Sequence, residues 1–429
     1  MAHSQPGVVL MGGGTDTEEA FEWQIRNADG GDFVIMRTGG TDAYNEWVYN
    51  ISSSIDAQLN SVTTLVMGTK ADSHNSSFLD HIQNAEAIFF AGGNQAEYMA
   101  KWVNTPVQQI IQSKLATTSV GGTSAGLAIL GGHVFTANST YVQENGLVSS
   151  DTLADPNSGN ITLSSAFLQI PLLSSVLTDT HFCTRNRMGR MLTFLSRLLA
   201  PMPTDGYAPS QLGKLHAIGI DEQTAVLVNT TTGLGTVVGQ STAYLCTPTA
   251  MPEMCSVHGK SEMCEPLTIR DIACTRFYGQ EEPRQTINFR ALKTPADKSV
   301  AGPVAYNNTI VDGEFTQQFP LQYGPLPNPT PDFIHSAPAS PNSSSDGGLG
   351  TPAVTAILAC VLIAIVIGAV AARKLLLGRQ DSSGQKQLQL QGQGERGGVM
   401  LSPLSADVEK QHMGGGSGVS ATNQRRLQA

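Results

Sequence analysis

The chain has 429 residues, and 40 % of them are hydrophobic, which is enough to bury one large core or two ordinary ones. Its 35 acidic residues outnumber 25 Lys and Arg, so the formal net charge is −10. Proteins that bind nucleic acid carry a basic patch or stripe, and this composition excludes nucleic acid as the expected partner.

Short apolar runs alternate with longer mixed segments through the first part of the chain. Gly or small polar residues follow each run, which is typical of βαβ units and predicts an α/β fold with a mainly parallel sheet flanked by helices. Two later runs flank Thr230–Gly235 and predict a hairpin that ends the sheet with antiparallel strands. The expected strands are Val8–Met11, Phe33–Met36, Val62–Met67, Ala87–Phe90, Thr117–Val120, Ala225–Val228 and Thr236–Val238.

A Gly-x-Ser-x-Gly motif at Gly122–Gly126 lies between the run Thr117–Val120 and a helix-like start at Ala125–Leu130. Small residues permit the tight strand-to-helix turn that holds a nucleophile in a strained conformation above a sheet edge. Ser124 is therefore the candidate nucleophile, and the Ala125 N–H would face an incoming carbonyl oxygen. Taken alone, the motif also fits an ordinary glycine-rich turn.

A serine nucleophile needs a base, and His181 lies beside a cluster of arginines at Arg185, Arg187 and Arg190. The cluster is unusual for a core helix, and guanidinium groups bind carboxylates in a bidentate manner. We interpret the block as a base followed by groups that hold a substrate carboxylate. A solvated basic helix start with a surface histidine is the alternative.

The base in turn needs a carboxylate that orients it. Asp221 and Glu222 end an apolar run, where the rim of the sheet is expected. Spacing does not decide which of the two accepts the His181 N–H.

The C-terminal part predicts a membrane-tethered protein. Residues 293–352 are rich in Pro, Asn, Ser and Gly and are expected to form a partly ordered stalk after a catalytic domain at 1–292. Ala353–Ala372 is uncharged and, as a helix, would span roughly the 30 Å of a bilayer core. Arg373, Lys374 and Arg379 follow, so the positive-inside rule places the tail 373–429, expected to be disordered, in the cytoplasm and residues 1–352 outside or in a lumen.

Sequons and cysteines agree with that orientation. The Asn-x-Ser/Thr sequons precede the apolar segment, at Asn50, Asn75, Asn138, Asn160, Asn229, Asn307 and Asn342. Cysteines without metal-type spacing suggest disulfides in an oxidising compartment, with three pairings open among Cys246, Cys255, Cys264 and Cys274. Cys183 is left over, and Cys360 lies in the apolar segment. Residues 1–10 show no signal peptide, and we expect a missing start of the gene rather than translocation directed by the late apolar segment.

The ordered blocks resemble the cyanophycinase family of serine peptidases, peptidase family S51, which is related to the aspartyl dipeptidases. The resemblance covers roughly residues 7–290 and rests on Gly12–Gly14, Phe89–Gln95, Gly122–Gly126, Asp179–Arg190 and Gly219–Ala225. It implies an α/β fold related to the class I glutamine amidotransferases and no metal or organic cofactor. It also implies a preference for β-aspartyl linkages, such as the β-Asp-Arg units of cyanophycin.

Site residues follow from the resemblance position by position. It places the nucleophile at Ser124, the base at His181 and the acidic member at Glu222. Backbone N–H groups of Gly93 and Ala125 would form the oxyanion hole. The expected substrate-pocket residues are Gln95, Asp179, Arg185, Arg187 and Arg190.

The chain also departs from the family pattern and leaves alternatives open. Thr180 stands where cyanophycinases usually carry Gln, and Leu199–Lys214 is an extra segment. An α-aspartyl dipeptidase or general exopeptidase would share the triad, and a non-catalytic membrane receptor could use the same fold. A glutamine amidotransferase is disfavoured because it uses Cys where this chain has Ser. The sequence leaves open whether the chain forms a homodimer.

Overall fold

The computed structural model describes residues 4–140, 146–199, 212–253, 266–292 and 303–316. All of them belong to the first of two compact units, Met1–Ile334 and His335–Ala429. Ala353–Ala372, the tail 373–429, most of the predicted stalk, Cys255 and Cys264 lie outside the described residues. Within the ranges that are described, no helix has the length and apolar character needed to cross a membrane.

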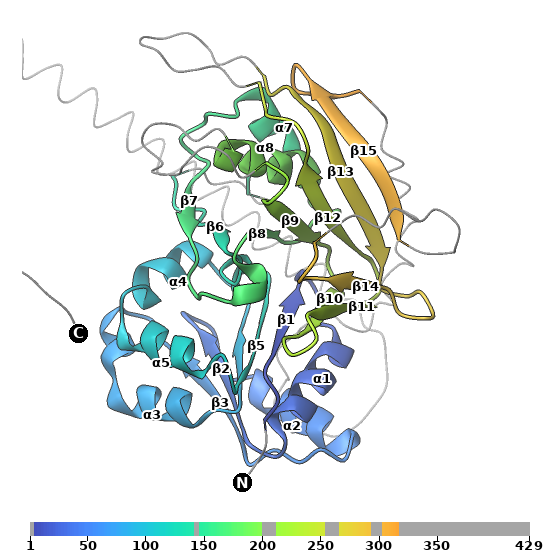
Figure 1. Ribbon diagram of the computed structural model, residues 1–429. Coiled ribbons are helices and arrows are strands. Elements are labelled where there is room, and N and C mark those ends of the chain that lie inside the picture. The colour runs from blue at the N-terminus through green and yellow to red at the C-terminus, as the bar shows by residue number, and fades with distance from the viewer. Residues whose placement is uncertain (1–3, 141–145, 200–211, 254–265, 293–302, 317–429) are drawn as a thin grey trace, which may run out of the picture. The chain divides into compact units, whose positions relative to one another are not determined.

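The described residues form two eight-stranded sheets, both visible in Figure 1. The first has the strand order β14-β11-β10-β1-β5-β4-β2-β3 and contains the strands β1 (Gly7–Met11), β2 (Asp32–Arg37), β3 (Ser61–Val66), β4 (Ala87–Phe90), β5 (Ser119–Thr123), β10 (Thr224–Asn229), β11 (Leu234–Gly239) and β14 (Thr286–Asn288). Strands β1 to β5 pair in parallel, and β10 and β11 form an antiparallel hairpin against β1. The predicted parallel core and the closing hairpin are confirmed.

Strand β5 begins two residues later and ends three residues later than predicted. Gly121 and Gly122 read as a turn in the sequence, but they pair with Val9 and Leu10 of β1 in regular parallel register. A Cβ on Gly121 would lie 2.9 Å from the Val9 Cβ, so glycine lets the central strands pack closely at this point.

The second sheet was not foreseen, so the prediction of one mainly parallel sheet describes only half of the fold. Its order is β16-β15-β13-β12-β9-β8-β6-β7, and its strands are β6 (His133–Phe135), β7 (Leu163–Ser165), β8 (Val176–Asp179), β9 (His216–Ile220), β12 (Thr242–Pro248), β13 (Ile269–Tyr278), β15 (Val304–Val311) and β16 (Glu314–Phe315). Strands β15 and β16 lie within the range 293–352 for which a stalk was predicted. A disulfide joins Cys246 and Cys274, which face each other on β12 and β13.

Helices cover both sheets. They are α1 (Glu18–Ala28), α2 (Tyr44–Ser54), η1 (Ala71–His74), α3 (Ser76–Asn84), α4 (Gln95–Trp102), α5 (Pro106–Lys114), α6 (Ala125–Ala128), α7 (Ser149–Ala154), η2 (Pro171–Leu173) and α8 (Met188–Leu199). One buried cluster joins α1 and α2 to the face of the first sheet that carries Val9 and Phe89. A second joins α3, α4 and α5 to the opposite face, with Val8 and Phe90, and extends to the second sheet. A third packs α8 onto the second sheet.

Candidate active site

Ser124 occupies a strained turn between β5 and α6. Its backbone has φ 53° and ψ −116°, a conformation that costs a non-glycine residue about 1–3 kcal/mol. The flanking glycines make the turn possible. A Cβ on Gly122 would lie 2.5 Å from the backbone of Gly126, and one on Gly126 would lie 2.0 Å from the carbonyl oxygen of Phe90. The glycines of the motif are therefore required by close packing, as in a nucleophile elbow.

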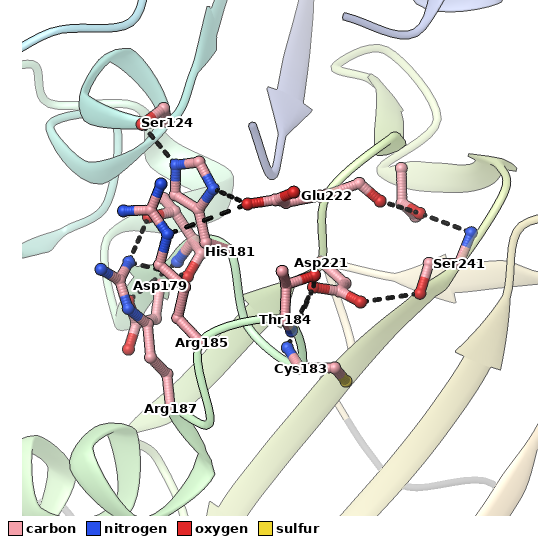
Figure 2. A network of polar contacts seen from close by, with 12 residues as sticks. Ser124, Asp179, His181, Cys183, Thr184, Arg185, Arg187, Asp221, Glu222 and Ser241 are labelled. Carbon is pink, nitrogen blue, oxygen red and sulfur yellow. Dashed lines mark hydrogen bonds and ion pairs between the residues drawn. The ribbon is translucent and has the colours of Figure 1, made fainter. Parts of the chain in front are cut away.

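Three side chains form one line of hydrogen bonds at this turn. The Ser124 Oγ lies 2.7 Å from His181 Nε2, and His181 Nδ1 lies 2.6 Å from Glu222 Oε1. Figure 2 shows the imidazole between the hydroxyl and the carboxylate. With Nδ1 protonated, His181 donates to Glu222 and its Nε2 accepts from the serine hydroxyl. This arrangement prepares the hydroxyl for deprotonation.

The electrostatics of the site favour a neutral His181 beside an ionised Glu222. Burial lowers the pKa of His181, and the positive charges of Arg185 and Arg187 lower it further, against the opposing effect of Glu222. The hydrogen bond from His181 lowers the pKa of Glu222. At neutral pH the imidazole is therefore neutral and the carboxylate is ionised, as a general base and its orienting acid require.

The triad lies where strands of both sheets end. Met11 of β1 pairs with Thr123 of β5, so the loop after β1 and Ser124 leave the first sheet side by side. Asp179 of β8 pairs with Gly219 of β9, so the segments carrying His181 and Glu222 leave the second sheet together. Parallel pairing thus brings residues far apart in the sequence to one location.

Successive carbonyl groups, of the last residue of β1 and of the glycine loop after it, accept N–H groups from the three triad segments. The carbonyl oxygen of Met11 accepts the Ser124 N–H at 3.1 Å, and that of Gly12 accepts the His181 N–H at 2.8 Å. The carbonyl oxygen of Gly13 accepts the Gln223 N–H, next to the triad carboxylate, at 2.9 Å. The sequence analysis used Gly12–Gly14 only for the family resemblance and gave these glycines no role.

Contacts of Asp221 and Glu222 distinguish two acids that sequence spacing did not. Asp221 Oδ1 accepts the backbone N–H groups of Cys183 and Thr184 at 3.0 and 2.9 Å, and its Oδ2 accepts the Ser241 hydroxyl at 2.8 Å. These donors occupy both oxygens of Asp221. Glu222 is the acid that contacts the imidazole.

Asp179 and Arg190, both predicted as substrate-pocket residues, form a buried ion pair. Arg190 Nε donates to Asp179 Oδ2 at 2.9 Å, and a second guanidinium nitrogen contacts the other carboxylate oxygen. The guanidinium also stacks 5.0 and 5.5 Å from the ring centres of Phe135 and Phe194. In this arrangement both charges are committed to each other beneath the site.

The other two arginines occupy different environments. Arg187 is buried, and its Nη1 donates to both the carbonyl and the hydroxyl oxygen of Thr180 at 3.0 Å. The side chain of Arg185 is 31 % exposed, and its Nε lies 3.8 Å from Glu222 Oε1. Of the three predicted arginines, Arg185 is the one that presents its guanidinium to solvent beside the triad.

The predicted oxyanion-hole residues adjoin the nucleophile. Ala125 is the first residue of α6, directly after Ser124. The loop after β4 approaches from the other side, because a Cβ on Gly92 would lie 3.6 Å from the Ser124 Cβ. Gly93 follows in that loop, and Gln95, half-buried, begins α4.

Comparisons with known proteins found similar sequences and structures. The sequence model of peptidase family S51 matches residues 37–154. A cyanophycinase from Geminocystis herdmanii is 28 % identical over 200 residues, which cover 46 % of this chain and 62 % of that protein. A cyanophycinase from Synechococcus elongatus is 26 % identical over 251 residues, covering 55 % and 68 %. The crystal structure of a peptidase from an acI-B1 actinobacterium aligns with a TM-score of 0.40 at 20 % identity, covering 61 % of this chain and 98 % of that one.

The family match includes the serine turn, and the cyanophycinase relatives extend the similarity over 200 residues or more. The chain is therefore similar to peptidase family S51 over the segment that carries Ser124, and it spans about two thirds of the length of the cyanophycinases it matches.

Proposed function

We propose that this chain is a serine-type peptidase that works through an acyl-enzyme, with Ser124 as nucleophile, His181 as base and Glu222 as orienting carboxylate. The observation that carries the proposal is the continuous hydrogen-bond line from the Ser124 hydroxyl to Glu222, with contacts of 2.7 and 2.6 Å, built on a strained turn. A fold that no longer catalysed hydrolysis would have no reason to maintain that strain.

The reaction follows from these groups. His181 Nε2 takes the Ser124 proton as Oγ attacks the scissile carbonyl carbon, and Glu222 stabilises the imidazolium that forms. The backbone N–H groups of Gly93 and Ala125 are the proposed donors to the oxyanion. The imidazolium then gives its proton to the leaving amine, and an acyl ester remains on Ser124. Water, deprotonated by His181, hydrolyses that ester and restores the free hydroxyl.

For the substrate, we propose peptides with a β-aspartyl linkage, which the cyanophycinase relatives suggest. Such substrates carry a carboxylate next to the scissile group. Arg185 is partly exposed and lies beside the triad, so it is our candidate to bind that carboxylate. Asp179 and Arg190 would act indirectly, by fixing the shape of the pocket from below.

The test compares the purified full-length chain with Ser124→Ala on β-Asp-Arg, β-Asp-Lys and α-Asp peptides. We expect wild-type turnover of the β-linked substrates, and none above background in the variant, at unchanged thermal unfolding temperature. Turnover of α-Asp peptides alone would instead assign an α-aspartyl dipeptidase. Equal turnover by the variant would remove Ser124 from the mechanism, and a wild-type chain inert to these substrates and to a serine-directed phosphonate would favour a non-catalytic receptor.

We also propose that Ala353–Ala372 anchors the protein in a membrane, with the catalytic unit extracellular or lumenal. The support is the sequence alone: an uncharged segment followed by Arg373 and Lys374. The expected result is retention of the chain in the membrane fraction after carbonate extraction, with a mobility shift on glycosidase treatment. Release by carbonate would contradict the anchor, and unchanged mobility would contradict the orientation.

A further inference from the structure

Asp221 is a buried carboxylate whose hydrogen bonds go not to the triad side chains but to the turn that follows His181. Its Oδ1 accepts the N–H groups of Cys183 and Thr184, together with the Thr184 hydroxyl at 2.9 Å. Its Oδ2 accepts the Ser241 hydroxyl from the turn that precedes β12. The carboxylate therefore joins the turn after His181 to a turn of the second sheet, as Figure 2 shows.

That turn carries the proposed base and needs to be held on both sides. His181 has φ 46°, in the left-handed region that side chains rarely adopt. On its upstream side, the His181 N–H is fixed by the Gly12 carbonyl group at 2.8 Å. On its downstream side, the residues of the turn point their N–H groups at one carboxylate oxygen of Asp221. Removing that oxygen takes away the acceptor of two partly buried N–H groups, so the turn loses the contacts that hold it on this side.

Asp221 and Glu222 are consecutive, so one short segment fixes both the imidazole and the turn that bears it. Asp221 directly follows β9 and Glu222 lies in the turn before β10, and their carboxylates face different partners. We propose that Asp221 is a positioning residue of the triad, which sets the approach of His181 Nε2 to Ser124 by holding the turn after the histidine. This inference rests on the proposed hydrolase function.

The size of the effect follows from the sensitivity of proton transfer to distance. The Ser124–His181 contact is 2.7 Å, and a displacement of about 1 Å can reduce turnover about 100-fold. Asp221→Ala removes every side-chain contact of the carboxylate. Asp221→Asn keeps an oxygen for the two N–H groups, and its amide can donate to the Ser241 hydroxyl oxygen, which is able to accept. The two variants therefore separate geometry from charge.

The experiment measures kcat, KM and the pH profile of the full-length chain on a β-Asp-Arg substrate. We expect Asp221→Ala to lower kcat by about 10- to 100-fold with KM within about twofold, and Asp221→Asn to stay within about threefold with an unmoved acidic limb. Asp32→Ala is the matched control. Asp32 Oδ1 also accepts two side-chain donors, from Asn60 and Ser61, but it lies at the start of β2, far along the strand from the site. That variant should lose stability without losing kcat.

Each outcome decides the inference. Wild-type kcat in folded Asp221→Ala overturns it, and so does an acidic limb that shifts equally in the Asn and Ala variants, since that pattern assigns an electrostatic role. If the Ala variant does not fold, the double variant Thr184→Val with Ser241→Ala replaces it, because it removes two hydroxyl donors and leaves the carboxylate in place. A kcat loss of about threefold or more in this variant supports the inference, and unchanged kcat overturns it. Failure of the proposed function itself shows separately, as equal turnover by wild type and Ser124→Ala.

Discussion

Gly13 offers the sharpest test of how the glycine loop supports the site. It has φ +111°, and a Cβ at this position would lie 2.4 Å from His181 Cε1 and 2.6 Å from His181 Nε2. Ordinary contact between such atoms begins near 3.5 Å. In Gly13→Ala the imidazole must therefore retreat by about 1 Å, or the loop must move.

Either response breaks the triad. A retreat of that size stretches the 2.7 Å contact between Ser124 and His181 beyond hydrogen-bond range. A moving loop withdraws the carbonyl groups that accept the N–H groups of His181 and Gln223. We expect kcat to fall about 100-fold or more. The strained φ should in addition cost about 1–3 kcal/mol of stability, visible as a lower thermal unfolding temperature.

The assay is steady-state turnover of a β-Asp-Arg substrate, with labelling of Ser124 by a serine-directed phosphonate as a second measure of its reactivity. Gly39→Ala is the matched control, because a Cβ at Gly39 would meet no atom within 4 Å and its φ is not positive. The control should keep wild-type kcat. A folded Gly13→Ala variant with unchanged kcat and unchanged labelling would refute the argument that this loop sets the position of the imidazole.

Other substitutions test the charges around the site. Burial places the pKa of His181 below its ordinary 6.5, so kcat/KM should stay constant at neutral pH and fall only as acid protonates the imidazole. Arg185→Ala removes a positive charge that lowers this pKa, so the acidic limb of a pH–rate profile should move to higher pH. Arg185→Lys keeps the charge and should leave the limb in place. Glu222→Gln keeps a hydrogen-bond acceptor but does not stabilise an imidazolium, and stopped assays should show kcat lower by about 10³- to 10⁴-fold with little change in KM. Arg190→Ala strands the buried charge of Asp179 and should cost about 3–5 kcal/mol in denaturant unfolding, whereas an unchanged midpoint would contradict the structural role of the pair.

The sequence predicted the first sheet well because its central strands are buried on both faces and read as continuous apolar runs. The second sheet escaped prediction for a physical reason. Strand β6, His133–Phe135, is too short for a period to emerge, and β13, Ile269–Tyr278, mixes charged residues with apolar ones because its two faces differ in exposure. Strand β15 lies in a segment whose composition resembles a linker, and its place in the sheet comes from pairing with β13.

In the candidate site, too, the features set by local sequence were predictable and those set by distant contacts were not. Ser124 was predictable because the turn that exposes it demands local glycines. The roles of Asp221 and Glu222 were not predictable from spacing, because these adjacent carboxylates face different neighbours and only the folded chain shows which neighbours those are. The ion pair between Asp179 and Arg190 was not predictable either, because the two residues lie on separate elements, at the end of β8 and on α8.

The triad is assembled across the two sheets, so the short glycine loop between them affects the distance between Ser124 and His181. The nucleophile follows β5 of the first sheet, whereas the base and the acid follow β8 and β9 of the second. A contact of 2.7 Å between the hydroxyl and the imidazole therefore depends on how the sheets are held at this point. Met11, the last residue of β1, accepts the Ser124 N–H, and the adjoining Gly12 and Gly13 accept those of His181 and Gln223. Backbone hydrogen bonds, which do not depend on side-chain identity, thus fix the spacing. Side chains in this loop would occupy the space that the imidazole and the carboxylate now fill, and glycine is the residue that lets one loop serve both sheets.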